Sequence, residues 1–350
     1  YDSRKVKDGS LFIAISGENQ DGHDYILEAI DKGASAIIAN GRAPISDIVP
    51  ILQVTNPRKT MSKIASNFYN NPSKDLNIIG ITGTNGKTTT TQIVDYIIKS
   101  NNRTSSSLGT LGFNTPSGMI STGFTTPESI ELQQILDTIK KGGIEYVPME
   151  ISSHAIELYR INDVDINIAI FTNIGHDHLD FHKSIDNYFS AKLKLFTKLN
   201  KNSLAILNYD DPYTEKIIKK INCNYLTYGF SNNADLSIKE YNLKINHSSA
   251  VLSYNNKLIK VDTQLIGKFN LYNISAAILC AIKLGINKNS IVKSIEQFIS
   301  VPGRLEKYNY KDNTVIIDYA HTPDAFLNIF KNISELKSKE KKIITVFGCG

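Results

Sequence analysis

Residues 80–91 join a glycine-rich turn to a lysine and a run of threonines, a pattern suited to holding a polyphosphate. The glycines leave backbone N–H groups free to face phosphate oxygens, and the helix expected after the turn adds its positive N-terminal end. Lys87 can reach the outer phosphates, and the Thr88 hydroxyl is placed to hold Mg²⁺. The glycine spacing departs from the strict Walker pattern, but the apolar run before the turn and the helical repeat after it predict a nucleotide site.

Two more polar segments follow apolar runs. Glu150 ends the first run, and residues 172–182 follow the second with three histidines and two aspartates. Ligands of a doubly wound sheet collect at the carboxyl ends of its strands, where a carboxylate can meet the magnesium of a nucleotide. The alternatives are a surface or helix-capping role for Glu150 and an exposed helix start for 172–182. Spacing does not decide which histidine is a ligand, and composition gives Lys192 no role.

The elements that must position these residues indicate an α/β fold in three regions. Residues 1–75 predict a small α/β domain. Strands and helices alternate over residues 76–306, which indicates a doubly wound, mostly parallel sheet with helices on both faces. Within this region, residues 225–266 are strand-like and polar, and predict a short antiparallel insertion.

Residues 307–350 begin a third domain. We expect a strand at 314–318, a helix introduced by Pro323 and a strand at 342–347. Because a unit of this size buries its own faces poorly, we expect that the chain lacks most of its C-terminal domain.

Composition narrows the function class. The 350 residues are 41% hydrophobic and 21% charged, and the net charge of +5 is spread without a dense basic block, which argues against nucleic acid as a partner. No apolar run approaches the roughly 18 residues of a membrane span, and no signal peptide is visible. Three cysteines without ligand spacing favour a reducing compartment. We expect a cytoplasmic, monomeric enzyme that binds neither nucleic acid nor membrane.

Taken together, the motifs resemble those of the Mur ligases of peptidoglycan synthesis. The resemblance covers essentially the whole chain and is carried by GTNGKTT at 83–89, MEISSHAIELYR at 149–160, TNIGHDHLDFH at 172–182 with AK at 191–192, GKFNLYN at 267–273, VPGRLE at 301–306 and DYAHTPDA at 318–325. DSRKV at 2–6 and DGH at 21–23 are similar to the MurE type, which adds the third amino acid of the stem peptide.

The resemblance implies an ATP-dependent carboxylate–amine ligase. Its substrates would be UDP-N-acetylmuramoyl-L-alanyl-D-glutamate and a diamino acid, joined through an acyl phosphate with ATP and two Mg²⁺ ions as cofactors. It also implies a UDP-substrate domain at 1–75, a central P-loop ATPase domain at 76–306 and a truncated, Rossmann-like amino-acid domain at 307–350.

The shared motifs imply which residues of this sequence would have the family's functional roles. Thr88 and Glu150 would hold one Mg²⁺, His178 would hold the second with Glu150, and Lys192 would act as a carbamate ligand. Lys87 and Arg304 would complete the catalytic set. The ATP contacts would be Gly83, Thr84, Asn85, Gly86, Lys87, Thr88, Thr89, Asn270, Asn273, Arg304 and Asp318.

The same carry-over gives the contacts to the UDP-sugar substrate: Ser3, Asn19, Gln20, Asp21, Thr125, Thr126, Ser152 and Arg160. The alternatives are a plain helix cap for Thr125 and Thr126 and a turn residue for Ser3. Leu158 stands where some members carry a polar substrate contact. The family's amino-acid-recognition motif would lie beyond Gly350, so the sequence leaves open whether diaminopimelate, lysine or another amine is added.

Three other functions are open. Folylpolyglutamate synthase shares the loop style and domain plan, although it should lack the N-terminal Asp-Ser-Arg segment. A P-loop kinase or GTPase would transfer phosphate to a hydroxyl or hydrolyse the nucleotide, but the chain carries no Asn-Lys-x-Asp guanine signature. A catalytically silent binding protein is the third alternative.

Overall fold

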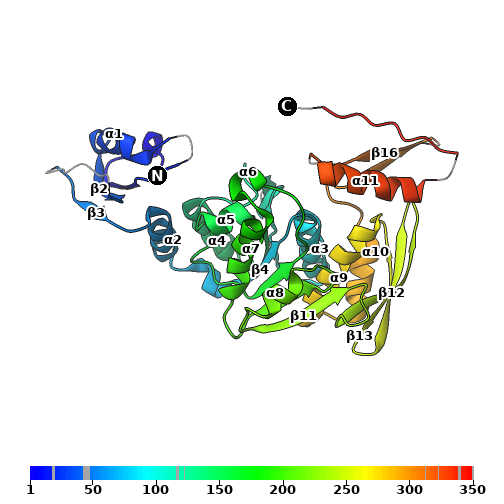
Figure 1. Cartoon of the computed structure of the whole chain (residues 1–350). Coiled ribbons are helices and arrows are strands. Elements are labelled where there is room, and N and C mark those ends of the chain that lie inside the picture. Colours follow the sequence, from blue (N-terminus) through cyan, green and yellow to red (C-terminus); the bar gives the residue numbers. More distant parts are fainter. Residues whose placement is uncertain are drawn as a thin grey trace. The chain divides into compact units, whose positions relative to one another are not determined.

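The structure, a computed structural model, describes residues 1–17, 20–41, 48–115, 118–121, 123–311, 313–321, 323–337 and 340–348. Its elements are coloured along the chain in Figure 1. The chain forms two compact units. Unit 1 comprises Tyr1–Pro72, Pro127–Thr138 and Ala155–Val164, and unit 2 comprises Ser73–Thr126, Ile139–His154 and Asp165–Gly350.

Unit 1 is built on a three-stranded parallel sheet of order β1–β2–β3, with Phe12, Ile26 and Ile37 fully buried in its core. Asn56 begins helix α2 by accepting a hydrogen bond from the Lys59 N–H at 3.0 Å. The elements are η1 (Ser3–Lys5), β1 (Ser10–Ile13), η2 (Gly22–Tyr25), α1 (Ile26–Asp31), β2 (Ala34–Ala39), β3 (Ile51–Gln53) and α2 (Pro57–Phe68). Helices α4 (Ser129–Lys141) and α5 (Ser153–Glu157) contribute residues to both units.

Unit 2 contains an eleven-stranded sheet of order β14-β13-β12-β11-β10-β9-β4-β8-β5-β6-β7. Strands from β11 to β5 run parallel, whereas β12–β13–β14 and β5–β6–β7 pair antiparallel. The strands are β4 (Asn77–Thr82), β5 (Leu108–Gly109), β6 (Gly112–Thr115), β7 (Gly118–Ile120), β8 (Tyr146–Glu150), β9 (Ile168–Phe171), β10 (Leu204–Asn208), β11 (Asn224–Gly229), β12 (Leu236–Leu243), β13 (Ser248–Tyr254) and β14 (Lys257–Thr263).

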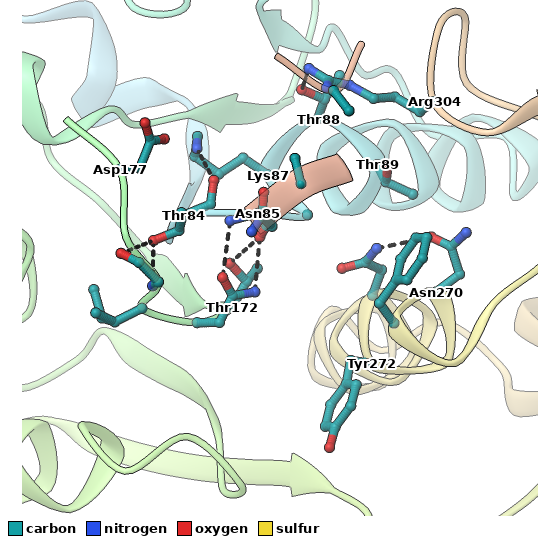
Figure 2. A pocket seen from close by; sticks show the side chains of 18 of the residues that line it. Thr84, Asn85, Lys87, Thr88, Thr89, Thr172, Asp177, Asn270, Tyr272 and Arg304 are labelled. Atoms are coloured by element: carbon teal, nitrogen blue, oxygen red, sulfur yellow. Dashed lines mark hydrogen bonds between the residues drawn. The ribbon is translucent and has the colours of Figure 1, made fainter. Parts of the chain in front are cut away.

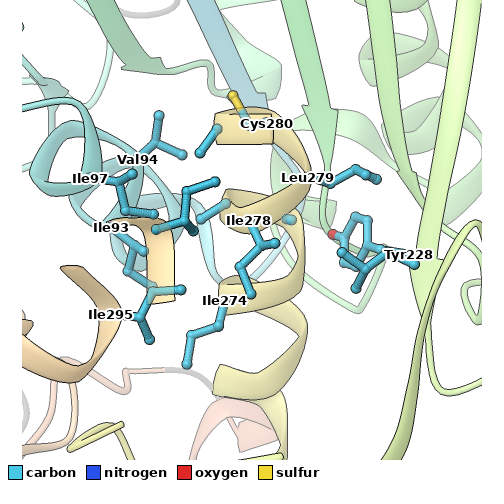
Figure 3. Packing of buried hydrophobic residues seen from close by; sticks show 14 of the residues in the cluster. Ile93, Val94, Ile97, Tyr228, Ile274, Ile278, Leu279, Cys280 and Ile295 are labelled. Atoms are coloured by element: carbon cyan, nitrogen blue, oxygen red, sulfur yellow. The ribbon is translucent and has the colours of Figure 1, made fainter. Parts of the chain in front are cut away.

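Helices cover both faces of this sheet. Ile168 and Ile170 of β9 belong to the core packed by α3, α9 and α10, while the next residue, Phe171, meets Phe196 of α7 edge to face at 6.1 Å. Figure 3 shows Ile93 and Ile97 of α3, Ile278 of α9 and Ile295 of α10 interlocked in the first core. The helices are η3 (Pro72–Asp75), α3 (Lys87–Ser100), α6 (Leu179–His182), α7 (Ile185–Thr197), α8 (Thr214–Ile218), α9 (Lys268–Lys283) and α10 (Lys288–Gln297).

The last part of unit 2 holds a two-stranded antiparallel sheet of β15 (Glu306–Tyr310) and β16 (Asn313–Ile317), followed by α11 (Pro323–Leu336). The strand predicted at 342–347 is wrong, because residues 341–348 lie outside any helix or strand. A strand needs a neighbour for its backbone hydrogen bonds, and no described strand pairs with this segment. Its Ile344 and Val346 are 89% and 94% exposed.

The predicted α/β class and mostly parallel sheet are confirmed. The antiparallel insertion expected at 225–266 is also present, as β12, β13 and β14. Among the described residues, no helix is both long and apolar enough to cross a membrane.

Candidate active site

The glycine-rich loop at 83–86 lies between β4 and α3, in the strand, loop and helix order of a nucleotide site. Gly83 and Gly86 have φ angles of 151° and 86°, which residues other than glycine rarely adopt. A Cβ at Gly83 would overlap the Thr172 hydroxyl, and one at Gly86 would overlap the Asn273 side chain. Both positions therefore require glycine, because of the backbone conformation and because a side chain has no space.

A second loop, after β9, braces the glycine-rich loop (Figure 2). The N–H groups of Thr84 and Asn85 donate to Asn173 at 2.8 and 3.0 Å, and the Thr172 hydroxyl donates to the Asn85 carbonyl at 2.6 Å. In return, the Gly175 N–H donates to the Thr84 hydroxyl at 2.8 Å. Segments far apart in sequence thus hold one another at the carboxyl ends of β4 and β9.

Two lysines, the half-buried Lys87 and the buried Lys192, approach the same loop carbonyl. Lys87 Nζ donates to the carbonyl oxygens of Gly83 and Thr84 at 2.9 and 2.8 Å, and Lys192 Nζ of α7 donates to Gly83 at 2.9 Å. Burial lowers the pKa of Lys87, and the charge of Glu150 partly offsets this. Burial also lowers the pKa of Lys192 well below its usual value, and the positive charge of Lys87 lowers it further.

Glu150 ends β8 with a side chain that is almost wholly buried. Its Oε2 accepts hydrogen bonds from the hydroxyls of Thr88 at 2.9 Å and Thr110 at 3.3 Å, and its Oε1 accepts the Thr110 N–H at 2.8 Å. A carboxylate beside a threonine hydroxyl offers the oxygen ligands that Mg²⁺ prefers.

His178 precedes α6 in a left-handed conformation, with φ at 53°. Its ring lies 4.7 Å from that of His154, edge to face, and 6.3 Å from that of Tyr188. Burial lowers the pKa of His178, the charge of Asp177 opposes this, and the two lysine charges add to the lowering. A lowered pKa favours the neutral imidazole, which has a lone pair available for a metal.

No three His, Cys, Asp or Glu side chains in the described part of the chain lie close enough to hold a metal by themselves. Magnesium bound with a nucleotide takes few protein ligands, because phosphates and water complete its shell. The neighbouring oxygens of Thr88 and Glu150 fit an ion of this kind.

Arg304 and Asp318 come from the C-terminal part of unit 2 and also line the site. The Arg304 guanidinium lies 3.4 Å from the Thr88 hydroxyl and stacks over the Tyr319 ring at 4.8 Å. Asp318 accepts the N–H groups of Leu305 and Ala320, both at 2.8 Å, and so fixes the turn that presents Arg304.

Helix α9 contributes two asparagines beside the glycine-rich loop. Asn273 Nδ2 donates to Asn270 Oδ1 at 2.9 Å, and Asn270 Nδ2 donates to the Ile266 carbonyl at 2.8 Å. The Thr90 hydroxyl donates to Asn273 Oδ1 at 3.3 Å, which links α9 to α3.

These groups border one cavity of about 990 Å³ within unit 2. The predicted residues that line it are Thr84, Asn85, Gly86, Lys87, Thr88, Thr89, Thr125, Glu150, Ser152, His178, Lys192, Asn270, Asn273, Arg304 and Asp318. Gly83 and Thr126 stand directly behind this lining, since Gly83 accepts from Lys87 and the Thr126 hydroxyl donates to the Glu150 carbonyl at 2.9 Å.

Of the predicted substrate contacts that the structure describes, four belong to unit 1. Ser3 is buried, Gln20 is exposed, and Asp21 caps η2 by accepting the His23 N–H at 3.0 Å. Arg160 forms an ion pair with Glu128 at 2.7 Å. Asn19 lies outside the described residues.

Thr110 and Tyr188 are among the cavity residues that the sequence analysis did not assign to the site. The Tyr188 ring lies 4.5 Å from Lys192 Nζ, and its hydroxyl lies 3.2 Å from that of Thr84. Its position one helical turn before Lys192 was a usable signal. Thr110 follows a strand of only two residues, β5, which is too short to show a periodic pattern.

Comparisons with known proteins identify the family of the chain. The Mur ligase middle domain matches residues 81–281, the Mur ligase family catalytic domain matches residues 1–69, and the Mur ligase glutamate ligase domain matches residues 303–350. The chain belongs to the Mur ligase family. The predicted family, the fold class and the assignment as a ligase are thereby confirmed.

Individual Mur ligases are similar along the whole chain. The UDP-N-acetylmuramoyl-L-alanyl-D-glutamate–2,6-diaminopimelate ligases of Syntrophomonas wolfei and Clostridium botulinum are 38% and 40% identical, over all of this chain and 72% and 73% of theirs. A solved structure of a ligase with the same name is 29% identical, with a TM-score of 0.83 over 97% of this chain and 70% of that one.

Proposed function

We propose that this Mur ligase joins the γ-carboxylate of UDP-N-acetylmuramoyl-L-alanyl-D-glutamate to an amino group of 2,6-diaminopimelate at the expense of ATP. The observation that carries the proposal is the convergence of Lys87, Glu150, His178, Lys192 and Arg304 on one cavity. The substrates are those in the names of the relatives that match the chain over its length.

ATP would bind along the loop at 83–86. The N–H groups at the start of α3 face the phosphates, and Lys87 exchanges its two carbonyl contacts for phosphate oxygens. Arg304 adds positive charge beside Thr88, while Asn270 and Asn273 border the space left for the base. Asp318 lines the same cavity, and we assign it to the ribose side of ATP.

Thr88, Glu150, His178 and a carbamate on Lys192 would hold two Mg²⁺ ions, which neutralise phosphate charge when bound. A neutral lysine amine can attack the carbon of CO₂ and release a proton, which gives an anionic carbamate. The lowered pKa of Lys192 supports this step, because burial favours the neutral amine.

A carboxylate is a poor electrophile, so it must first be activated. One of its oxygens attacks the γ-phosphorus of ATP, the bond to the bridging oxygen breaks, and ADP leaves. The amine then attacks the acyl carbon and loses a proton, and phosphate departs as the amide forms. Lys87 and Arg304 offset the negative charge that develops on the transferred group.

The sugar-peptide substrate would use Thr125, Thr126 and Ser152 in unit 2, and Ser3, Asn19, Gln20, Asp21 and Arg160. In domain terms, we assign residues 1–75 to UDP-substrate binding, 76–306 to ATP binding and 307–350 to the start of an amino-acid domain. We further propose that the protein is a monomer. We also propose that it is cytoplasmic, in line with the soluble nature of its nucleotide and amino-acid substrates.

The test follows the first chemical step alone. ATP carrying a heavy isotope in its β–γ bridge is incubated with the protein and UDP-N-acetylmuramoyl-L-alanyl-D-glutamate. Reversible acyl-phosphate formation moves the label into non-bridging β positions, and Lys87→Ala should prevent it. Absence of scrambling with this acid would refute the proposal. Mass spectrometry of the product from 2,6-diaminopimelate or lysine then identifies the amine.

The same assay separates the main rival. A folylpolyglutamate synthase would scramble the label with a folate and not with the UDP-linked acid. A kinase would transfer the γ-phosphate to a hydroxyl, and a silent binding protein would leave the label in place.

A further inference from the structure

Glu150 contacts the end of β5, a segment to which the sequence analysis assigned no role. Strand β5 runs parallel to β8, with Leu108 paired to Met149, so Gly109 and Thr110 arrive beside Glu150 at the carboxyl edge of the sheet. A Cβ at Gly109 would overlap the Glu150 carboxylate and lie within 2.6 Å of its Cγ. Only a glycine allows this close approach.

Thr110 then supplies two of the three hydrogen bonds that the Glu150 carboxylate receives from named donors. Its N–H donates to Oε1 at 2.8 Å and its hydroxyl to Oε2 at 3.3 Å, beside the Thr88 hydroxyl at 2.9 Å. Both carboxylate oxygens are thus directed, one by a main-chain group and one by two hydroxyls. Partners of this kind fix a ligand's orientation and tune its affinity for a metal.

The Thr110 hydroxyl also lies 3.2 Å from the hydroxyl of Thr125. A hydroxyl has one proton to donate, so when Thr110 donates to Glu150 it accepts from Thr125. The adjacent Thr126 hydroxyl donates to the Glu150 carbonyl at 2.9 Å and accepts the Ser152 N–H at 3.2 Å. Residues 125–126 are therefore tied to Glu150 through both its side chain and its main chain.

We infer that the Gly109–Thr110 segment positions Glu150 and couples it, through the Thr110 hydroxyl, to the cavity wall at Thr125. Thr110 acts through Glu150 and Thr125 and is a positioning residue. An acid that binds at Thr125 changes the hydrogen bond received by Thr110, and hence the orientation of Glu150. By reciprocity, the factor by which the bound acid changes metal affinity at Glu150 equals the factor by which the metal changes affinity for the acid. This inference rests on the proposed function of the cavity.

The experiment measures metal binding without turnover. Mn²⁺ serves as the probe, bound in the presence of a non-hydrolysable ATP analogue and followed by electron paramagnetic resonance, with and without UDP-N-acetylmuramoyl-L-alanyl-D-glutamate. The variants are Thr110→Val, Thr110→Ser and Gly109→Ala. Thr197→Val is the matched control, because its exposed hydroxyl donates to a helix carbonyl at the end of α7.

Thr110→Val should weaken Mn²⁺ binding about tenfold, the range for loss of an outer partner, and abolish the effect of the UDP-linked acid on Mn²⁺ affinity. Thr110→Ser should restore both, and Thr197→Val should match the wild type. Gly109→Ala should weaken Mn²⁺ binding at least as much as Thr110→Val, since the added methyl displaces the carboxylate.

The outcomes separate the two proposals. If the wild type binds Mn²⁺ with the nucleotide and responds to the acid, but Thr110→Val does the same, the inference is wrong and the proposed function stands. If the wild type shows neither response, both fail. Thermal unfolding of each variant identifies misfolding, and a misfolded Thr110→Val leaves the serine and alanine variants to decide.

Discussion

At the scale of single residues, Lys192 combines a buried amine with a predicted catalytic role. Its side chain is 1% exposed, beneath the Tyr188 ring and beside the Gly83 carbonyl. We predict that Lys192→Ala lowers ligation at least about a hundredfold, as loss of a charged group at a transferring phosphate does. Binding of the UDP-linked acid, measured by calorimetry, should remain within a few-fold of wild type.

The control is Lys194→Ala, which changes an exposed lysine on the same helix. The wild type should also show a carbamate carbon signal by nuclear magnetic resonance in isotope-labelled bicarbonate, and Lys192→Ala should lose it. Undiminished turnover of Lys192→Ala would remove Lys192 from the mechanism.

Burial of the Lys192 amine should lower the stability of the folded protein. Because burial lowers the pKa of Lys192 from 10.5, the unfolded chain binds more protons than the folded protein between the lowered value and 10.5. The contribution of this amine to stability therefore rises with pH across that window. In buffer free of CO₂, Lys192→Met should raise the melting temperature by about 2–4 °C, and by more at pH about 6 than at pH about 9. An equal or opposite shift would contradict the assigned cause.

At the scale of elements, the loop at 83–86 depends on Gly86 for two separable reasons, its positive φ and the contact with Asn273. Gly285, at the end of α9, shares the positive φ at 77° but has open space where a Cβ would stand. We predict that Gly285→Ala loses about 1–2 kcal/mol of stability through its positive φ, and that Gly86→Ala loses at least as much. Only Gly86→Ala should also lose affinity for an ATP analogue, at least about tenfold.

Calorimetric titration of both variants with the analogue checks this. Equal affinities for Gly86→Ala and Gly285→Ala would show that the contact with Asn273 has no part in nucleotide binding, and that backbone strain alone accounts for the glycine.

At the scale of the whole molecule, the parts predictable from sequence were those with a strong local signal. The loop at 83–86 and the apolar strands before Glu150 and Thr172 follow from pattern alone, and family motifs supplied Lys192 and Arg304. Thr110 could not be found, because its role arises only when β5 pairs with β8. The strand expected at 342–347 was wrong because strand formation also depends on pairing: an apolar run becomes a strand only when a neighbour accepts its hydrogen bonds.

The core of unit 2 joins the elements that carry the site. Ile278 of α9 is 1% exposed among residues of α3 and α10, and these helices position the glycine-rich loop and the two asparagines. We predict that Ile278→Ala lowers the free energy of unfolding by roughly 2–5 kcal/mol, because it leaves a cavity. Ile299→Ala, at a side chain 67% exposed, should cost less than about 0.5 kcal/mol.

Denaturant unfolding of both variants measures these values. Titration with an ATP analogue, at a denaturant concentration far below the unfolding midpoint, measures nucleotide binding. Because Ile278 is not among the residues that line the cavity, the folded Ile278→Ala protein should bind the analogue within about threefold of wild type. The analogue should also raise the stability of both proteins by similar amounts at a given ligand excess. A large loss of affinity in the folded variant would mean that the core sets the geometry of the site, and not only its persistence.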